Sequence, residues 1–337
     1  MDDDSGNYGD ARLKERLERY GHKEKEMVVK CLLSCVAWFP PEGKMSLTRD
    51  ILDADTDETL YKVYKNLYTG LFTPMKATSA LGSVSASPHP NRQKNVYRIA
   101  VPIDESQSRA ATFRDHLLRR DGHRCVITKW VEKGYHQHAG YSRDVPQSRV
   151  EAAPIVPFAY GSWDGEAAHH YLAKRWEVLY RCFPSVRRTG LSAENINSPK
   201  NGLCLQSDLR HAFGQFSMAF KATGVKDQYE LKVYRSANAE VDVIIGQTGM
   251  VTFKQATGYK DIPLPDADIL ECHYRLAEIL NATGLGKEIN WHFENWNRMR
   301  RAPEAGQLTE DGSTDLTSYL EAAFWWAASP ASPVLSV

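Results

Sequence analysis

Apolar positions recur at helical spacing through the first quarter of the chain. Between residues 56 and 72, Leu60, Val63, Tyr64, Leu67 and Leu71 fall on one face of an expected helix, behind Thr56 as its N-cap. Residues 11–39 also read as a long helical stretch. Because such stripes pack against other elements, the sequence predicts a helical region over residues 1–75.

This pattern stops where the chain becomes rich in Ser, Pro and Ala. The segment 76–95 reads KATSALGSVSASPHPNRQKN, and with the residues up to 105 it predicts a linker and a connecting strand. A second polar linker begins at Arg301, and residues 315–329 predict a last helix. That helix ends in the triplet Phe324, Trp325 and Trp326, which is expected to dock on the same chain.

The pattern between these linkers mixes helical and alternating periods. Residues 108–122 predict a helix that ends at Gly122, followed by a strand at 125–130, a loop at 131–149 and a second strand from 150. Short apolar runs at 216–222, 229–236, 241–249 and 250–256 predict an antiparallel sheet. Residues 266–284 predict a capped helix with His273 among its buried positions. The expected class is α+β, with residues 106–300 as one domain and residues 301–337 as linker and helix.

Three pieces of this domain carry a signature. They read DGHRCVITKW from Asp121, VEAAPIVPFA from Val150 and NSPKNGLCLQSDLRHAFGQF from Asn197. Together they resemble the HNH nuclease domain of many fungal proteins, in which the second piece reads AAHIxP and the third NGLxLxxDLHxxF. Pro154 stands at the family's first histidine and Arg210 at its last, while Asn201 retains the family's letter. The family has glycine at the position of Lys129, so an altered turn is expected there, because lysine resists positive φ.

The resemblance implies an HNH-like ββα core and assigns a role to each of these positions. In the family, the first histidine activates water, the asparagine orients that histidine's strand, and the last histidine helps to hold a divalent cation. Proline cannot act as a general base, and arginine has no lone pair for a metal. We therefore predict that the ordinary nuclease chemistry is lost and that no metal or other cofactor is bound.

Other residues leave an alternative open. His211 directly follows Arg210, and one helical step turns its side chain by roughly 100°. With Glu151 and Asp208 it could hold one divalent cation such as Mg or Zn, although none of these residues has the paired spacing of a strong metal motif. The remaining histidines near the signature are His136, His138, His169 and His170. The adjacent pair lies in a predicted helix, where its members face different directions.

Composition adds few constraints. Lys plus Arg equals Asp plus Glu at 42 each, so no global positive field attracts nucleic acid. A local basic cluster of Arg114, Arg119, Arg120, His123 and Arg124 reads as a solvated helix face, with a phosphate track as the alternative. The six cysteines form no CxxC pair and predict buried, reduced thiols. The acidic start of the chain and the lack of a long apolar run predict a soluble cytoplasmic or nuclear protein without membrane contact.

Aromatic residues are dense around the altered signature. They suit an apolar pocket for a small molecule or a surface on which bases stack, and ordinary packing is the third interpretation. The predicted substrate-binding residues are Trp130, Tyr135, Tyr141, Trp163 and Trp176.

These observations lead to one functional hypothesis. A nuclease-like fold binds a small organic molecule and transforms it as a cyclase or isomerase, by analogy with fungal secondary metabolism. Arg210 would hold an oxyanion, and Asp208 or His211 would move a proton. Asn201 would keep its structural role, and Glu151 completes the candidate site.

Two other functions remain as alternatives. One is a metal-dependent endonuclease that uses Glu151, Asp208 and His211. The other is a non-catalytic interaction module that binds through the basic helix near Arg119.

Overall fold

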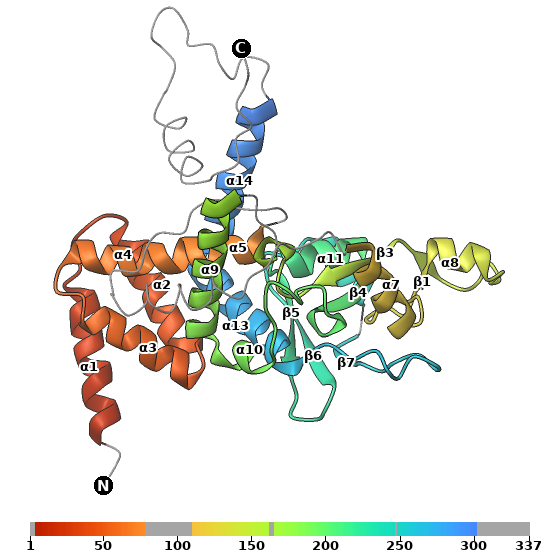
Figure 1. Ribbon diagram of the computed structural model, residues 1–337, viewed down its shortest axis with the longest axis horizontal. Coiled ribbons are helices and arrows are strands. Elements are labelled where there is room, and N and C mark those ends of the chain that lie inside the picture. The colour runs from red at the N-terminus through yellow and green to blue at the C-terminus, as the bar shows by residue number, and fades with distance from the viewer. Residues whose placement is uncertain (1–3, 78–109, 162–164, 247, 302–337) are drawn as a thin grey trace, which may run out of the picture.

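The computed structural model of the chain describes residues 4–77, 110–161, 165–246 and 248–301 (Figure 1). Most of the expected first linker, the expected C-terminal helix with Phe324, Trp325 and Trp326, and Trp163 lie outside these residues.

The N-terminal part is helical, as predicted. Its elements are α1 (Asp4–Glu18), α2 (Lys25–Trp38), α3 (Pro41–Leu52), α4 (Asp57–Leu67), the π-helix η1 (Tyr68–Phe72) and α5 (Thr73–Lys76). The Thr56 hydroxyl accepts a hydrogen bond from the Thr59 backbone N–H at 3.1 Å, which confirms the predicted cap. The five apolar residues predicted behind it are all buried.

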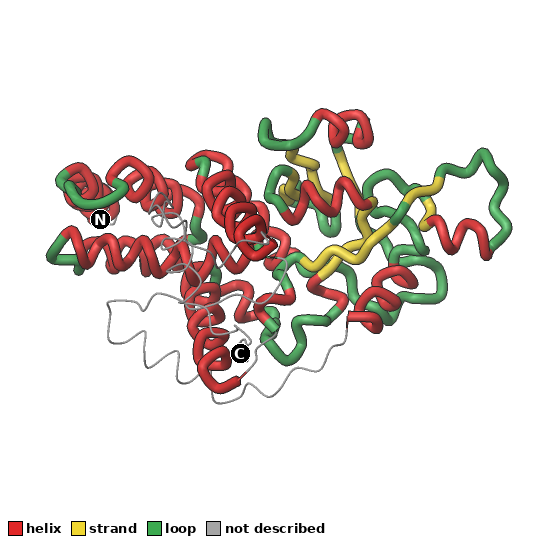
Figure 2. The backbone as a smooth tube through the Cα atoms, turned by 90° about the horizontal axis from the view of Figure 1, so that it is seen from above, coloured by secondary structure: helices red, strands yellow, loops and turns green. Residues whose placement is uncertain are grey.

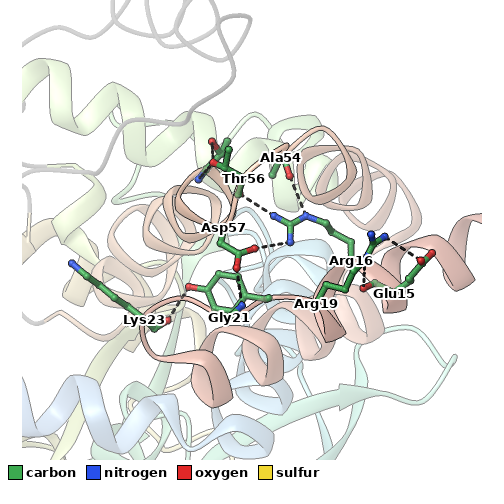
Figure 3. A network of polar contacts seen from close by, with 10 residues as sticks. Glu15, Arg16, Arg19, Gly21, Lys23, Ala54, Thr56 and Asp57 are labelled. Carbon is green, nitrogen blue, oxygen red and sulfur yellow. Dashed lines mark hydrogen bonds and ion pairs between the residues drawn. The ribbon is translucent and has the colours of Figure 1, made fainter.

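The long helical stretch expected over residues 11–39 is in fact two helices. Gly21 lies at the break, and its N–H donates to Asp57 Oδ2 at 2.7 Å. Arg16 closes the same corner, because its guanidinium bonds to Asp57 Oδ1 at 2.9 Å and to the carbonyls of Ala54 and Thr56 (Figure 3). The backbone hydrogen bond from Gly21 is the main reason that the pKa of Asp57 is lowered. A tertiary contact, which periodicity does not reveal, therefore sets the helix boundary.

The remainder combines helices with three small sheets, so the predicted α+β class is confirmed. A two-stranded parallel pair joins β1 (Val131–Glu132) to β2 (Gln147–Ser148), with α8 (Lys133–His138) between them. An antiparallel pair joins β3 (Val150–Pro154) to β4 (Gly202–Gln206). The third sheet has the order β5 (Met218–Ala222), β6 (Gln228–Val233), β7 (Met250–Thr252) and is antiparallel.

The same part of the chain contains further helices. They are α7 (Ala110–Arg120), α9 (Gly165–Cys182), α10 (Pro184–Arg188), α11 (Ser207–Gly214), α12 (Ala239–Ile245), α13 (Ala267–Thr283) and α14 (Leu285–Arg301), with 3-10 turns η2 (Phe158–Tyr160) and η3 (Pro199–Asn201). The Asp266 side chain caps α13, and Gly284 ends it at a φ of 79°. The helix predicted over residues 266–284 is therefore confirmed.

Three local predictions are wrong. Residues 125–130 form a turn instead of a strand, and residues 241–245 lie in α12, although their apolar run was expected to extend as a strand. A short apolar run fits either element, and here helix α12 packs against α11. The insert at 131–149 is not only a loop, because it contains β1, α8 and β2. Helix α14 was not predicted at all.

The helical part and the sheet-containing part share one core. Helix α13 packs on β5 with one side and on α2 with another, and α9 packs on α3 and η1. Figure 2 shows the helices concentrated toward one end and the strands toward the other. Arg181 on α9 binds Asp50 Oδ2 at 2.9 Å and Asn66 Oδ1 at 2.6 Å, which ties α9 to α3 and α4.

Buried side chains confirm two further predictions. The imidazole of His273 is stacked between the rings of Phe213 and Phe216, with ring centroids 3.8 and 4.3 Å away. Burial lowers the pKa of His273 to about 3. All six cysteines are buried free thiols, as expected. Within the described residues, no helix is long and apolar enough to cross a bilayer.

Lys76 joins the helical part to the end of α11. Its ammonium donates to the backbone carbonyl of Gln215 at 3.1 Å and to Gln215 Oε1 at 2.9 Å, and the residue is 5% exposed. Burial alone lowers its pKa to about 8. The folded protein therefore penalises the charged form of Lys76.

A pH dependence follows from this lysine. The lysine of the unfolded chain keeps its proton up to its ordinary pKa near 10.4, whereas Lys76 in the folded protein loses its proton near 8. Above pH 8 the unfolded state binds more protons, so the Lys76 contribution to stability rises with pH. From pH 7 to pH 9.5 we expect wild-type stability to rise by about 2 kcal/mol relative to Lys76→Met, measured by urea unfolding. Parallel pH profiles of the two proteins would contradict this expectation.

Candidate functional site

The signature residues meet on a ββα unit made of β3, β4 and α11. In the antiparallel pair, Val150 lies opposite Gln206 and Pro154 lies opposite Gly202. A Cβ on Gly202 would lie 2.3 Å from a ring carbon of Phe113 on α7, so helix α7 covers that position. Helix α11 begins directly after β4 and packs on β3. The ββα arrangement implied by the resemblance is therefore present.

Asn201 braces the segment that follows Pro154. Its side-chain oxygen accepts from the Val156 N–H at 2.8 Å, and its amide nitrogen donates to the carbonyls of Val156 and Ile196 at 2.9 Å each. Its backbone carbonyl accepts from the Ile155 N–H at 2.9 Å. Asn201 is fully buried, and all these bonds hold backbone. This geometry suits the structural role expected for it.

Glu151 and Arg210 form the polar centre of the unit. Arg210 Nε on α11 lies 3.3 Å from Glu151 Oε2 on β3. Glu151 Oε1 accepts from Arg149 Nε at 2.7 Å and from the Ser207 hydroxyl at 3.3 Å. We call Arg149, Glu151, Ser207 and Arg210 the arginine cluster. Two guanidinium groups around one carboxylate leave it with a net positive charge.

The cluster is open to solvent. The side chains of Arg149 and Arg210 are 80% and 45% exposed, and that of Glu151 is 25% exposed. Each arginine uses its Nε in the pair with Glu151. A guanidinium has five N–H donors, so further donors on each arginine can reach an anion from solvent.

Asp208 and His211 flank Arg210 on α11, and both are exposed. They lie three positions apart, so they are neighbours on the helix surface. Across the described ranges, no three side chains of His, Cys, Asp or Glu come close enough to hold a metal ion. Both oxygens of Glu151 already face cationic or hydroxyl donors. The residues brought together here therefore fit an anion better than a divalent cation.

The other candidate histidines lie elsewhere. His136 on α8 is 4% exposed, and its Nε2 lies 3.1 Å from the Val145 carbonyl. His138 and His170 are exposed on α8 and α9, and the His169 side chain lies outside the described residues.

The turn between α7 and β1 departs from expectation. An altered turn was expected because lysine resists positive φ, but Lys129 itself adopts a left-handed φ of 61°. The backbone conformation that favours glycine is therefore present here with a lysine. The Lys129 N–H donates to the Cys125 carbonyl at 3.0 Å, and its ammonium donates to the Val126 carbonyl at 2.7 Å. These bonds offset the roughly 1–3 kcal/mol that such a conformation costs a non-glycine residue.

The predicted aromatic residues divide into two groups. Trp130 and Tyr141 are each 38% exposed, and the Tyr135 ring lies flat on His123, with centroids 3.8 Å apart and planes 4° apart. Trp176 instead lies in the core at 1% exposure, where its indole N–H donates to the Tyr160 carbonyl at 2.8 Å. Trp176 is placed as a packing residue, because its position on α9 faces the interior.

The basic cluster beside α7 also divides. Arg119 is half-exposed and pairs with Asp115 at 3.0 Å, as a solvated helix face would. Arg120 is fully buried and bound to Asp121, so neither a solvated face nor a phosphate track describes it. The sequence did not reveal that Arg120 is a buried structural residue. It also did not reveal that Arg149 and Ser207 belong to the arginine cluster. The available signal was their positions, because Arg149 directly precedes β3 and Ser207 is the first residue of α11.

One comparison with known proteins bears on the site. Residues 125–221 match the family model described as HNH endonuclease, and this match covers less than a third of the chain. No curated protein and no solved structure matches the chain significantly. The matched range begins in the turn after α7 and contains the insert, β3, α9, α10, β4, α11 and most of β5. Residues 125–221 are therefore similar to an HNH endonuclease domain.

Proposed function

We propose that this HNH-type domain no longer hydrolyses phosphodiesters by the family's ordinary route and instead binds a small organic anion at the arginine cluster. The observation that carries the proposal is the ion pair between Arg210 and Glu151 at 3.3 Å. It places a fixed cation where the resemblance implies a metal ligand. The free donors of Arg210 and Arg149 would bind a carboxylate, phosphate or enolate oxygen.

Asp208 and His211 give this site groups that can move a proton. Both are exposed on α11, where Asp208 lies two positions before Arg210 and His211 one position after it. A proton removed from a carbon of the bound anion by one of them and returned at another position is an isomerisation, and it needs no oxidant or metal. Arg210 would stabilise the negative charge that forms on the oxygen during the transfer.

Anion binding is tested first with a simple carboxylate. We expect cyclohexanecarboxylate to bind in isothermal titration, and Arg210→Gln to weaken this binding about tenfold, because a charge-assisted hydrogen bond contributes about 1.5–3 kcal/mol. Arg188→Gln is the matched control. Arg188 is also an exposed arginine paired with a glutamate, Glu42, but it lies outside the arginine cluster. Equal binding by both variants would contradict the proposal.

Glu151→Gln distinguishes this proposal from the endonuclease alternative. Removing the carboxylate frees two guanidinium groups, so we expect this variant to bind the carboxylate a few-fold more tightly. The family match supports an endonuclease as the second candidate. In an endonuclease with Glu151 as a metal ligand, the same substitution would abolish metal-dependent DNA cleavage.

A further inference from the structure

We propose that the turn before β1 and the insert after it carry a ring-stacking surface, and that the anion bound at the arginine cluster is one that carries a planar aromatic ring. The surface consists of Trp130, Tyr141 and Arg124, supported by Tyr135 on His123. This inference rests on the proposed function and adds a substrate class to it.

The stacking surface is built by unusual backbone. Gly122, His123 and Lys129 all have positive φ, at 64°, 55° and 61°. Such conformations cost free energy in non-glycine residues. They persist where surrounding contacts hold them in place, which is common at binding and active sites. Here they lead the chain around a tight turn that ends at Trp130, whose carbonyl accepts from the Cys125 N–H at 3.0 Å.

Tyr135 and Tyr141 are ordered by contacts with neighbouring rings. Tyr135 lies flat on His123, and burial lowers the pKa of His123, which favours the neutral ring. Tyr141 contacts the rings of Tyr135 and His136, with centroids 6.3 and 5.5 Å away. Tyr141 and Trp130 nevertheless remain more than a third exposed. Preformed aromatic groups that stay open to solvent lose little entropy when a ring stacks on them.

Positive charge accompanies these rings. The Arg124 guanidinium lies 5.7 Å from the Tyr141 ring centroid, and its Nη1 donates to the Lys129 carbonyl at 2.8 Å. Arg124 therefore adds a cation to the aromatic surface. A ligand that complements the combined surface carries both a planar ring and a negative charge.

The backbone connects this surface to the arginine cluster. Val131, next to Trp130, pairs with Gln147 on β2, and its N–H donates to the Pro146 carbonyl at 3.0 Å. Two residues after Gln147, the Arg149 carbonyl accepts from the Ser207 N–H at 3.0 Å, at the start of α11. Figure 1 shows β1 and α8 beyond the end of the β3–β4 pair at which β3 begins and β4 ends. The insert therefore continues directly into the anion site.

The test compares two acids that differ in their rings. We expect 2-naphthoate to bind about tenfold more tightly than cyclohexanecarboxylate, because a planar aromatic ring stacks on exposed aromatic side chains and a saturated ring does not. Trp130→Leu and Tyr141→Leu should each remove most of that advantage without changing cyclohexanecarboxylate binding. Tyr259→Leu is the matched control, since Tyr259 is a tyrosine of nearly equal exposure, 37%, outside the insert.

The outcomes separate the two proposals. If neither acid binds, the proposed function fails. If both acids bind equally and Trp130→Leu has no effect, the anion site remains and the stacking surface is wrong. Binding of single-stranded oligothymidylate that Trp130→Leu weakens, without binding of 2-naphthoate, would overturn the small-molecule assignment in favour of nucleic acid.

Discussion

Arg120→Met is expected to destabilise the fold by about 3–5 kcal/mol, because it removes the guanidinium that pairs with a buried carboxylate and that donates to one buried and two partly buried carbonyls. Arg120 Nε and Nη2 bind the two oxygens of Asp121 at 2.7 and 2.9 Å. Its Nη1 donates to the carbonyls of Pro199 and Pro263, and Nη2 also donates to that of Gly202. All five donors of this guanidinium are thus used, and the side chain is fully buried.

The loss is expected to reach the candidate site. Asp121 Oδ2 also accepts from the Cys204 N–H at 3.0 Å on β4, so the pair anchors α7 to the strand before α11. Arg120→Lys should also destabilise the fold, because a lysine ammonium has three donors and lacks the planar, forked geometry of a guanidinium.

Arg119→Met is the control for Arg120→Met, and urea unfolding is the measurement. Arg119 is the neighbouring residue, half-exposed and paired with Asp115, so its loss should cost less than about 1 kcal/mol. Equal stability of the two variants would show that the buried network contributes nothing special.

Gly43→Ala is expected to destabilise the protein by about 3 kcal/mol through a backbone clash. A Cβ on Gly43 would lie 2.0 Å from the carbonyl oxygen of Cys182, so α3 and α9 approach too closely for any side chain there. The better helix propensity of alanine, about 1 kcal/mol, offsets only part of this overpacking.

Gly214→Ala is the matched control, because Gly214 is also helical and its Cβ would meet nothing within 4 Å. We expect it to keep or slightly raise the thermal midpoint, whereas Gly43→Ala lowers it by several degrees. A Gly43→Ala protein as stable as Gly214→Ala would mean that the two helices can move apart without cost.

Much of the fold follows from local sequence pattern. The stripe behind Thr56 and the helix from Asp266 were predictable because each has a cap and a periodic apolar face. The break at Gly21 was not, because it depends on Asp57 and Arg16, which meet only in the folded chain. The apolar residues of α12 predict a strand as readily as a helix, because seven residues are too few to separate the two periods.

The candidate site was predictable in part. The signature located β3, β4 and α11, and Arg210, Glu151 and Asn201 lie on or beside them. Arg149 lies two residues before Glu151, so spacing could have indicated this pair, whereas Ser207 is brought to Glu151 only by the pairing of β3 with β4. Burial was equally hidden, so Trp176 was grouped with exposed aromatic residues although it lies in the core.

The central claim of the proposal is that this site has lost the metal-dependent nuclease chemistry that the resemblance implies. The most direct test is plasmid nicking by the purified protein with magnesium, manganese and zinc in turn, beside a His211→Ala variant. The account predicts no nicking above the metal-only background for either protein. Metal-dependent nicking by the wild type that His211→Ala abolishes would contradict it and establish an endonuclease with relocated ligands.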